Sequence, residues 1–312
     1  MLVTDYLLKA VHTFQIRTLV SRGFQTRVVL SNSSGSTAKY ATDYRVDLTV
    51  YQPDGRVRET VQDVAVLKQS ERRTIDCAPF VKGEPGDCIL VFHLIPLRLE
   101  QQSRESPLGP VVDVHKEELW ALLSAQDHYV EYYREDDGFS SGVLYQSGAF
   151  NYDKFSKEST TIIQAPKCYV SKHLNTFFSL MHTSMAPDYR KSAEMRCALV
   201  GTSGQRLAQW TETLAPFESR LIDIRAVLHA HDPQRWLGDD PFFCCFYAVC
   251  TDATMLPLTF TMNEPKRTLA VEHSLPPLYY GSQVSGPTRA RAIRDFAASS
   301  LLNTQSKSGS LA

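Results

Sequence analysis

Residues 19–34 of this chain read LVSRGFQTRVVLSNSS, and residues 169–184 read YVSKHLNTFFSLMHTS. Two unrelated stretches of this length would share about one identical position at ordinary residue frequencies. These two share five: Val20/Val170, Ser21/Ser171, Thr26/Thr176, Leu30/Leu180 and Ser34/Ser184. The recurrence indicates an internal repeat, and this repeat decides how the fold is interpreted.

The similarity continues further along the chain. Residues 44–57 (YRVDLTVYQPDGRV) correspond to residues 194–207 (EMRCALVGTSGQRL), and each segment has a glycine, Gly55 or Gly204, between two strand-like runs. Glycine supplies the positive φ that tight turns require. Both segments are therefore predicted to form a strand, a turn and a second strand.

A third pair of segments has an acidic residue at the same place. RRTIDC at 72–77 corresponds to SRLIDI at 219–224, so Asp76 and Asp223 each follow an isoleucine at the end of a predicted strand. A residue repeated in both halves is best explained by the shared fold. We expect each carboxylate to accept a hydrogen bond from a backbone amide in the turn that follows.

Apolar residues alternate along the predicted strands, as in Tyr44, Val46, Leu48 and Val50. A period of two buries one face of a sheet and leaves the other in solvent. Many short strands with turn signals between them indicate β-sandwiches. The predicted fold is all-β, with two tandem immunoglobulin-like or similar β-sandwich domains that arose by internal duplication and one short linking helix.

The repeat also sets the predicted domain boundaries. Residues 1–104 form the first sandwich, and residues 105–138 form a linker that contains the helix. Residues 139–281 form the second sandwich, which carries insertions. Residues 282–312 form a mostly disordered tail that is able to form a short amphipathic helix.

The composition is that of a soluble globular protein, with 43% hydrophobic and 21% charged residues. The net charge of −1 gives no electrostatic reason to expect nucleic acid as a partner. No apolar run reaches the ~20 residues of a membrane span, and the N-terminus lacks the pattern of a signal peptide. We expect a cytoplasmic protein that contacts a membrane, if at all, only through its C-terminal tail.

The cysteines are odd in number and irregular in spacing, which matches neither a zinc ribbon nor a disulfide framework. Several lie in apolar runs, where a thiol behaves as a small hydrophobic group. We expect reduced cysteines in the cores and no cofactor. The seven are Cys77, Cys88, Cys168, Cys197, Cys244, Cys245 and Cys250.

Residues 143–166 have no counterpart in the first half of the chain. Segments added to a rigid scaffold tend to carry binding sites. Polar and aromatic residues from this segment and from the end of the second domain are predicted to line a pocket or an interface, and no catalytic residue is predicted. The predicted binding residues are Tyr145, Asn151, Tyr152, Glu272 and His273.

Three histidines offer an alternative metal site. His229 and His231 are two residues apart, and His182 could complete the three nitrogen ligands of a zinc or iron centre. The repeat opposes this hypothesis because it aligns His182 with Asn32, and both residues could serve as the polar group at a strand end.

The sequence favours a non-enzymatic binding or assembly protein that contacts a protein partner or a second copy of itself. A metal-dependent or carbohydrate-active enzyme, with a histidine-lined site in the second domain, is the first alternative. The second alternative is a carbohydrate-binding or membrane-associated adaptor module. A carbohydrate-binding module would expose aromatic residues in a row, with Trp210 and Trp236 as the candidates.

Overall fold

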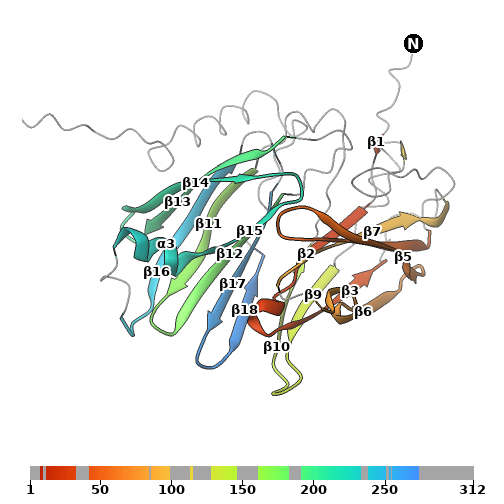
Figure 1. Ribbon diagram of the computed structural model, residues 1–312, viewed down its shortest axis with the longest axis horizontal. Helices are drawn as coiled ribbons and strands as arrows, with labels where there is room; N and C mark the ends of the chain where they lie inside the picture. Colours follow the sequence, from red (N-terminus) through yellow and green to blue (C-terminus); the bar gives the residue numbers. More distant parts are fainter. Residues whose placement is uncertain are drawn as a thin grey trace, which may run out of the picture.

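Antiparallel β-strands make up nearly all of the regular secondary structure of the described residues in the computed structural model (Figure 1). The strands form four sheets of four strands and one sheet of two, the latter made of β1 (Leu8–Lys9) and β8 (Asp113–Val114). The four larger sheets stack in pairs as two β-sandwiches that lie side by side, so the all-β prediction is confirmed. The structure describes residues 8–9, 12–32, 42–83, 86–98, 113–114, 128–145, 161–182, 191–232, 238–250, 253 and 255–273.

The first sandwich, on the right in Figure 1, consists of sheets with the strand orders β2-β7-β4-β5 and β10-β9-β3-β6. Its inward-facing side chains, such as Phe14, Leu48 and Phe92, are fully buried. Its strands are β2 (His12–Arg17), β3 (Gln25–Ser31), β4 (Tyr44–Tyr51), β5 (Val57–Leu67), β6 (Arg72–Asp76), β7 (Ile89–Pro96), β9 (His128–Tyr133) and β10 (Ser140–Tyr145).

The second sandwich, on the left in Figure 1, consists of sheets with the orders β11-β16-β13-β14 and β15-β12-β17-β18. Phe178, Leu180 and Phe246 lie in its own core. Its strands are β11 (Thr161–Val170), β12 (Leu174–His182), β13 (Ala193–Gly201), β14 (Arg206–Leu214), β15 (Ser219–Asp223), β16 (Phe242–Cys250), β17 (Met255–Asn263) and β18 (Thr268–Glu272).

Both sandwiches have the same strand order. When the eight strands of each are numbered along the chain, one sheet reads first, sixth, third, fourth, and the other reads eighth, seventh, second, fifth. The first strand thus pairs with the sixth, whereas immunoglobulin domains place their first strand in the sheet of the second. The sandwich architecture was predicted, but the strand order differs from the immunoglobulin arrangement.

The first sandwich extends further along the chain than predicted. His128–Tyr133 forms β9, which pairs with β3, and Ser140–Tyr145 forms β10, which pairs with β9. The prediction of a linker up to residue 138 and a second domain from residue 139 is therefore wrong for these two strands. Along β9, buried and half-buried side chains alternate, which is the pattern of a strand with one face in a core and not of a helix in a linker. Apart from β8 at Asp113–Val114, the predicted linker from residue 105 to residue 127 lies outside the described residues, as does the tail at 282–312.

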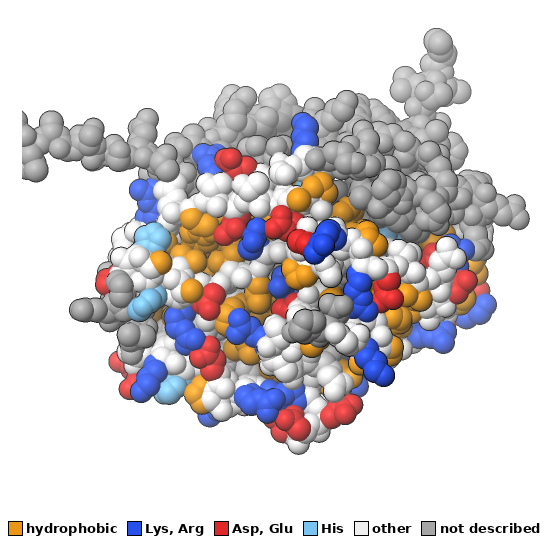
Figure 2. All heavy atoms as spheres, viewed as in Figure 1, with side chains coloured by type: hydrophobic (Ala, Val, Ile, Leu, Met, Phe, Trp, Pro, Cys, Tyr) orange, Lys and Arg blue, Asp and Glu red, His pale blue; other side chains and the backbone are white. Residues whose placement is uncertain are grey.

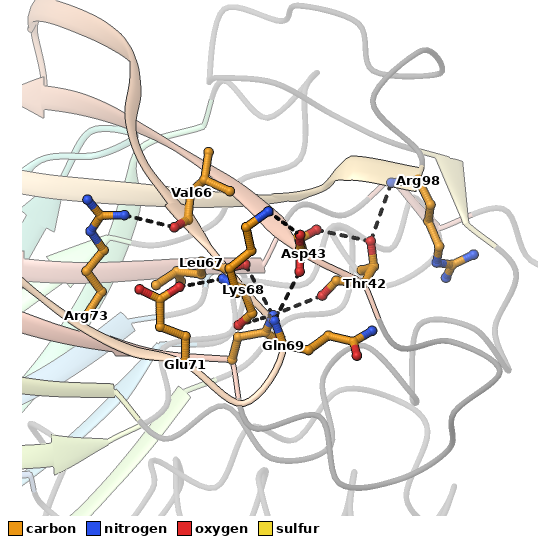
Figure 3. A network of polar contacts seen from close by, with 10 residues as sticks. Thr42, Asp43, Val66, Leu67, Lys68, Gln69, Glu71, Arg73 and Arg98 are labelled. Atoms are coloured by element: carbon orange, nitrogen blue, oxygen red, sulfur yellow. Dashed lines mark hydrogen bonds and ion pairs between the residues drawn. The ribbon is translucent and has the colours of Figure 1, made fainter.

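The turns that link the fourth and fifth strands are built alike in both sandwiches. The Glu71 carboxylate accepts a hydrogen bond from the backbone amide of Lys68 at 2.6 Å, and the Glu218 carboxylate accepts one from the amide of Ala215 at 2.8 Å. Figure 3 shows the first of these turns, in which Lys68 Nζ also donates to Asp43 at 2.8 Å. Equivalent positions in the repeat thus perform equivalent local tasks.

The side chains that precede these turns also correspond. Asn32 Nδ2 donates to the carbonyl of Lys68 at 3.1 Å, and His182 Nδ1 donates to the carbonyl of Ala215 at 2.8 Å. Both residues are buried. This confirms the expectation that the asparagine and the histidine serve as the polar residue at a strand end.

Asp76 and Asp223 also have the role expected of them. Asp76 Oδ1 accepts a hydrogen bond from the amide of Ala78 at 3.0 Å, at the start of α1 (Ala78–Val81). Asp223 Oδ1 accepts one from the amide of Ala226 at 2.9 Å and caps α3 (Ile224–His231). Asp223 is thus the N-cap of its helix, whereas Asp76 precedes the N-cap Cys77 of α1, and both carboxylates have a scaffold role.

The two inner strands of the sheet β15-β12-β17-β18, β12 and β17, are buried on both faces. Phe178 points into the core of the second sandwich, whereas Phe177 and Phe260 belong to a hydrophobic cluster that is continuous with the core of the first sandwich. Tyr132 of β9 meets Phe260 edge-on, with ring centroids 5.4 Å apart. The two sandwiches are therefore joined by buried apolar surface.

Candidate functional site

The structure brings together two of the five predicted binding residues, Tyr145 and His273. Their rings stack with centroids 5.1 Å apart and planes inclined by 5°. Tyr145 ends β10 of the first sandwich, and His273 follows β18 of the second. Glu272 is exposed, while Asn151 and Tyr152 lie outside the described residues. The Tyr145–His273 pair thus lies at the junction of the sandwiches.

The surroundings of this pair are largely apolar. The Tyr145 hydroxyl donates to the carbonyl of Gln15 at 2.5 Å, and the Tyr145 ring lies 4.8 Å from that of Phe14. Burial lowers the pKa of His273 to about 4. Its Nε2 is buried and has no hydrogen-bond partner in the described part of the chain. At neutral pH His273 is therefore an uncharged ring that packs at the junction.

Two arginines of the first sandwich reach across the same junction. Arg17 donates to the hydroxyl of Ser219 at 3.0 Å and pairs with Asp87 at 3.4 Å. The guanidinium of Arg22 lies 3.7 Å above the ring of Phe177. Burial lowers the pKa of Arg17, and the neighbouring Asp87 counteracts this effect. The two side chains thus add polar and cation–π contacts to the apolar junction.

The histidines of the alternative metal site have separate roles. His182 is buried in β12 and engages Ala215. His229 and His231 are exposed on α3, where residues two apart point in different directions. Across the described ranges, no three His, Cys, Asp or Glu side chains come together in a group that could hold a metal ion.

A buried hydroxyl–imidazole contact lies on the sheet β2-β7-β4-β5 and was missed by the sequence analysis. Thr49 Oγ1 is 3.0 Å from His93 Nε2, and burial lowers the pKa of His93 to about 4. A nucleophile and base would need a third group to orient the imidazole. The nearby Asp47 instead accepts hydrogen bonds from Arg45 and from the amide of Asp63. The pair is therefore a polar contact within the sheet.

An aromatic patch on the second sandwich was also missed. Tyr169 of β11 lies opposite Phe243 of β16, and their ring centroids are 5.5 Å apart. Cys244 and Phe246 face the core, so the alternating residues Phe243 and Tyr247 face outward. Tyr169 is 36% exposed and is among the few exposed large hydrophobic residues of the described chain. We call Tyr169, Phe243 and Tyr247 the aromatic face.

Trp210 does not contribute to this patch. Its ring meets the core residue Phe246 edge-on at 5.8 Å, and its Nε1 donates to Glu212 at 2.8 Å. Trp236 lies outside the described residues. Alternation around Phe243 is the sequence signal for these outward-facing aromatic residues, but the run FFCCFYAVC at 242–250 is apolar at every position, so its sequence does not show which side faces outward.

Side-chain hydroxyls form hydrogen bonds with backbone groups at two sheet edges. Tyr132 donates to the carbonyl of Arg17 at 2.7 Å, next to the bond from Tyr145 to Gln15 on the same edge strand, β2. On edge strand β11, the hydroxyl of Thr176 accepts from the Tyr169 amide at 2.9 Å. Occupied backbone groups are unable to pair with an added strand.

Charge is evenly mixed on the face that Figure 2 shows, where Lys and Arg side chains alternate with Asp and Glu. The net charge of the whole chain is −1. Neither observation favours a polyanionic ligand. None of the helices among the described residues has the length and hydrophobicity that crossing a bilayer requires.

No protein-family model matches the sequence, and no curated protein matches it. Among solved structures, a glycosyl hydrolase family 2 member from Bacteroides cellulosilyticus aligns at 6% identity with a TM-score of 0.18, over 83% of this chain and 27% of its own. A β-glucuronidase from Bacteroides uniformis aligns at 9% identity with a TM-score of 0.17, over 84% of this chain and 26% of its own.

An M60 catalytic domain with two CBM51 domains, from Clostridium perfringens ZmpB, aligns at 9% identity with a TM-score of 0.17, over 79% of this chain and 33% of its own. The chain thus spans about a quarter to a third of these proteins. Similarity at this level carries no argument about what the chain binds or does.

Proposed function

We propose that the chain is a non-enzymatic binding protein that holds a protein partner on the aromatic face. The observation that carries the proposal is the contact between Tyr169 and Phe243 on the outer side of a rigid sheet. Aromatic residues are enriched in protein interfaces, and a few of them usually supply most of the binding free energy. Lys167 is exposed on the same strand and favours a partner with an acidic rim.

Two edge strands already have backbone groups bonded to side-chain hydroxyls, which supports binding of the partner through a sheet face and not through a sheet edge. An exposed edge can bind a partner by pairing with an added strand. Hydroxyl groups already occupy backbone positions of β2 and of β11. A partner that approaches β11 would therefore meet the side chains of Tyr169 and Phe243 before it could pair with the strand.

We also propose that the two sandwiches arose by internal duplication. The common strand order supports this, as do the matching turns after Lys68 and Ala215. Under this proposal the junction and the aromatic face are surfaces in which the second sandwich differs from the first.

Site-specific photocrosslinking tests the proposed function. A photoreactive phenylalanine at position 243 is introduced into the full chain, which is irradiated in an extract of the source cells. We expect one discrete protease-sensitive adduct. Unlabelled wild-type protein should compete for it, while Tyr169→Ala should need about tenfold more protein or more to compete, because a central aromatic residue is removed. Leu144→Ala is the matched control, since Leu144 is 55% exposed on the first sandwich.

Two outcomes would contradict the proposal. If Tyr169→Ala competes as well as the wild type and Leu144→Ala, the aromatic face is not the contact surface. If the adduct resists protease and is displaced by oligosaccharides, the ligand is a carbohydrate and the proposed protein partner is wrong.

A further inference from the structure

Two core cysteines of the second sandwich lie directly opposite each other. Cys168 of β11 and Cys244 of β16 are register partners, and both are fully buried in the same core. Opposed residues of an antiparallel pair have Cα atoms about 4.5 or 5.5 Å apart, depending on the pair type. Both separations fall within the range of about 4.4–6.8 Å found in disulfides.

The two thiols also influence each other, because the neighbouring Cys244 and burial together raise the pKa of Cys168. The Cys168 thiol donates to the carbonyl of Pro166 at 3.9 Å. The other two cysteines of this core are placed differently, because Cys197 faces Ala248 and Cys250 faces Met195. Cys197 and Cys250 are thus diagonal neighbours, whose Cα atoms lie about 7–8 Å apart. That separation is too large for a disulfide without movement of the backbone.

We propose that Cys168 and Cys244 are a modification site, a thiol pair that a low-molecular-weight disulfide such as oxidised glutathione converts to a cross-strand disulfide. One cysteine thiolate attacks the reagent and releases one glutathione, which leaves a mixed disulfide. The second thiolate attacks the protein sulfur of that mixed disulfide and releases the other glutathione. The two protein sulfurs lose two electrons, and the two thiol protons end on the two glutathione molecules.

The environment of the pair determines when this reaction occurs. Both thiols are inaccessible in the folded sandwich, and the high pKa of Cys168 keeps its thiolate scarce. Oxidation should therefore be fast during folding and slow in the native protein. Once formed, the bond ties the edge strand β11 to the inner strand β16.

The full chain is refolded from urea with reduced or with oxidised glutathione, and free thiols are then blocked with N-ethylmaleimide in denaturant. The chain has seven cysteines, so the reduced sample should take up seven maleimides and the oxidised sample two fewer, which is five. A non-reducing peptide map should link Cys168 to Cys244. The melting temperature should rise by roughly 5–10 °C and fall again with dithiothreitol.

Variants make the assignment specific. Cys244 and Cys245 are adjacent and fall in the same peptide of the map. Cys245→Ser, at a partly exposed position, should keep the link, which assigns it to Cys244. Cys197→Ala/Cys250→Ala should keep the link, and Cys168→Ala/Cys244→Ala should lose both the link and the shift in melting temperature. Uptake of seven maleimides by the oxidised wild type, or a link through Cys197, Cys245 or Cys250, would overturn the proposal, and neither result depends on a variant that folds.

Discussion

Arg27 and Phe177 occupy corresponding positions of the two sandwiches, yet Arg27 lies at the surface and Phe177 in a core. Arg27 lies opposite Glu131 and pairs with it at 2.6 Å, with 43% of its side chain exposed. Phe177 lies opposite Phe260 and is 1% exposed. The same strand pair thus forms a solvated surface in the first sandwich and the junction in the second.

The first prediction compares these two positions. Phe177→Ala should lower the free energy of unfolding by about 3–5 kcal/mol, because it leaves a cavity in a buried cluster. Arg27→Ala should lower it by about 0–1 kcal/mol, because exposed ion pairs contribute little. Urea unfolding followed by tryptophan fluorescence measures both values. Equal losses for the two variants would contradict the assigned environments.

The second prediction concerns the hydroxyl of Tyr145. Tyr145→Phe keeps the ring stacked on His273 but removes the hydrogen bond that the hydroxyl donates to the buried carbonyl of Gln15. The free energy of unfolding should fall by about 0.5–1.5 kcal/mol, which is the usual net contribution of one hydrogen bond. Tyr133→Phe is the control, because its hydroxyl makes only an exposed 3.4 Å contact with Asp76. We expect almost no change in the control when both are measured in urea.

The third prediction is a pH dependence that arises from His273. Burial lowers its folded-state pKa to about 4, whereas an unfolded histidine has a pKa of about 6.5. Between these values the unfolded state binds more protons, so stability is lost as the pH falls from about 6.5 towards 4. His273→Phe should therefore lose about 2–3 kcal/mol less than the wild type between pH 7 and pH 4.5.

Urea titrations at each pH measure this difference. His229→Phe, at an exposed position of α3, is the matched control and should keep the wild-type profile. A His273→Phe protein with the same pH profile as the wild type would show that His273 is not buried at the junction.

The fourth prediction uses two glycines at corresponding turns. Gly55 and Gly204 have φ values of 84° and 82°, so alanine is strained at both positions by about 1 kcal/mol or more. A Cβ at Gly55 would also lie 2.6 Å from the carbonyl oxygen of Pro216 in the other sandwich, while a Cβ at Gly204 would meet nothing within 4 Å. Gly55→Ala should therefore be clearly more destabilising than Gly204→Ala in calorimetry.

The features of the fold that depend on residues close together in the chain were predictable from the sequence. Turn glycines, strand alternation and the aspartates at 76 and 223 act through neighbours a few residues away, and the structure confirmed these roles. Strand β9 lies in the segment that was predicted as a linker with a helix. Its place in the first sandwich depends on pairing with β3, which lies far away in the sequence and leaves no local signal.

The contacts between the two sandwiches could not be predicted, because no pattern in the sequence marks the residues that make them. Arg17 and Ser219 are 202 residues apart, and neither residue type is unusual for a surface. Tyr145 and His273 were named together on composition alone, and their stacking is settled by how the sandwiches dock. The outward direction of Tyr169 and Phe243 depends on the register of β11 against β16, which the sequence does not encode locally.

The burial of both faces of β12 and β17 has a consequence for biosynthesis. The described strands of the first sandwich end at Tyr145 and those of the second begin at Thr161, so the first sandwich leaves the ribosome first. The apolar outer side of β12 and β17 can therefore be covered as soon as it forms, because its cover is already folded. In the opposite order of synthesis, that apolar surface would stay exposed until its cover was made, so the order of the two sandwiches along the chain shortens the time during which the surface is open to aggregation.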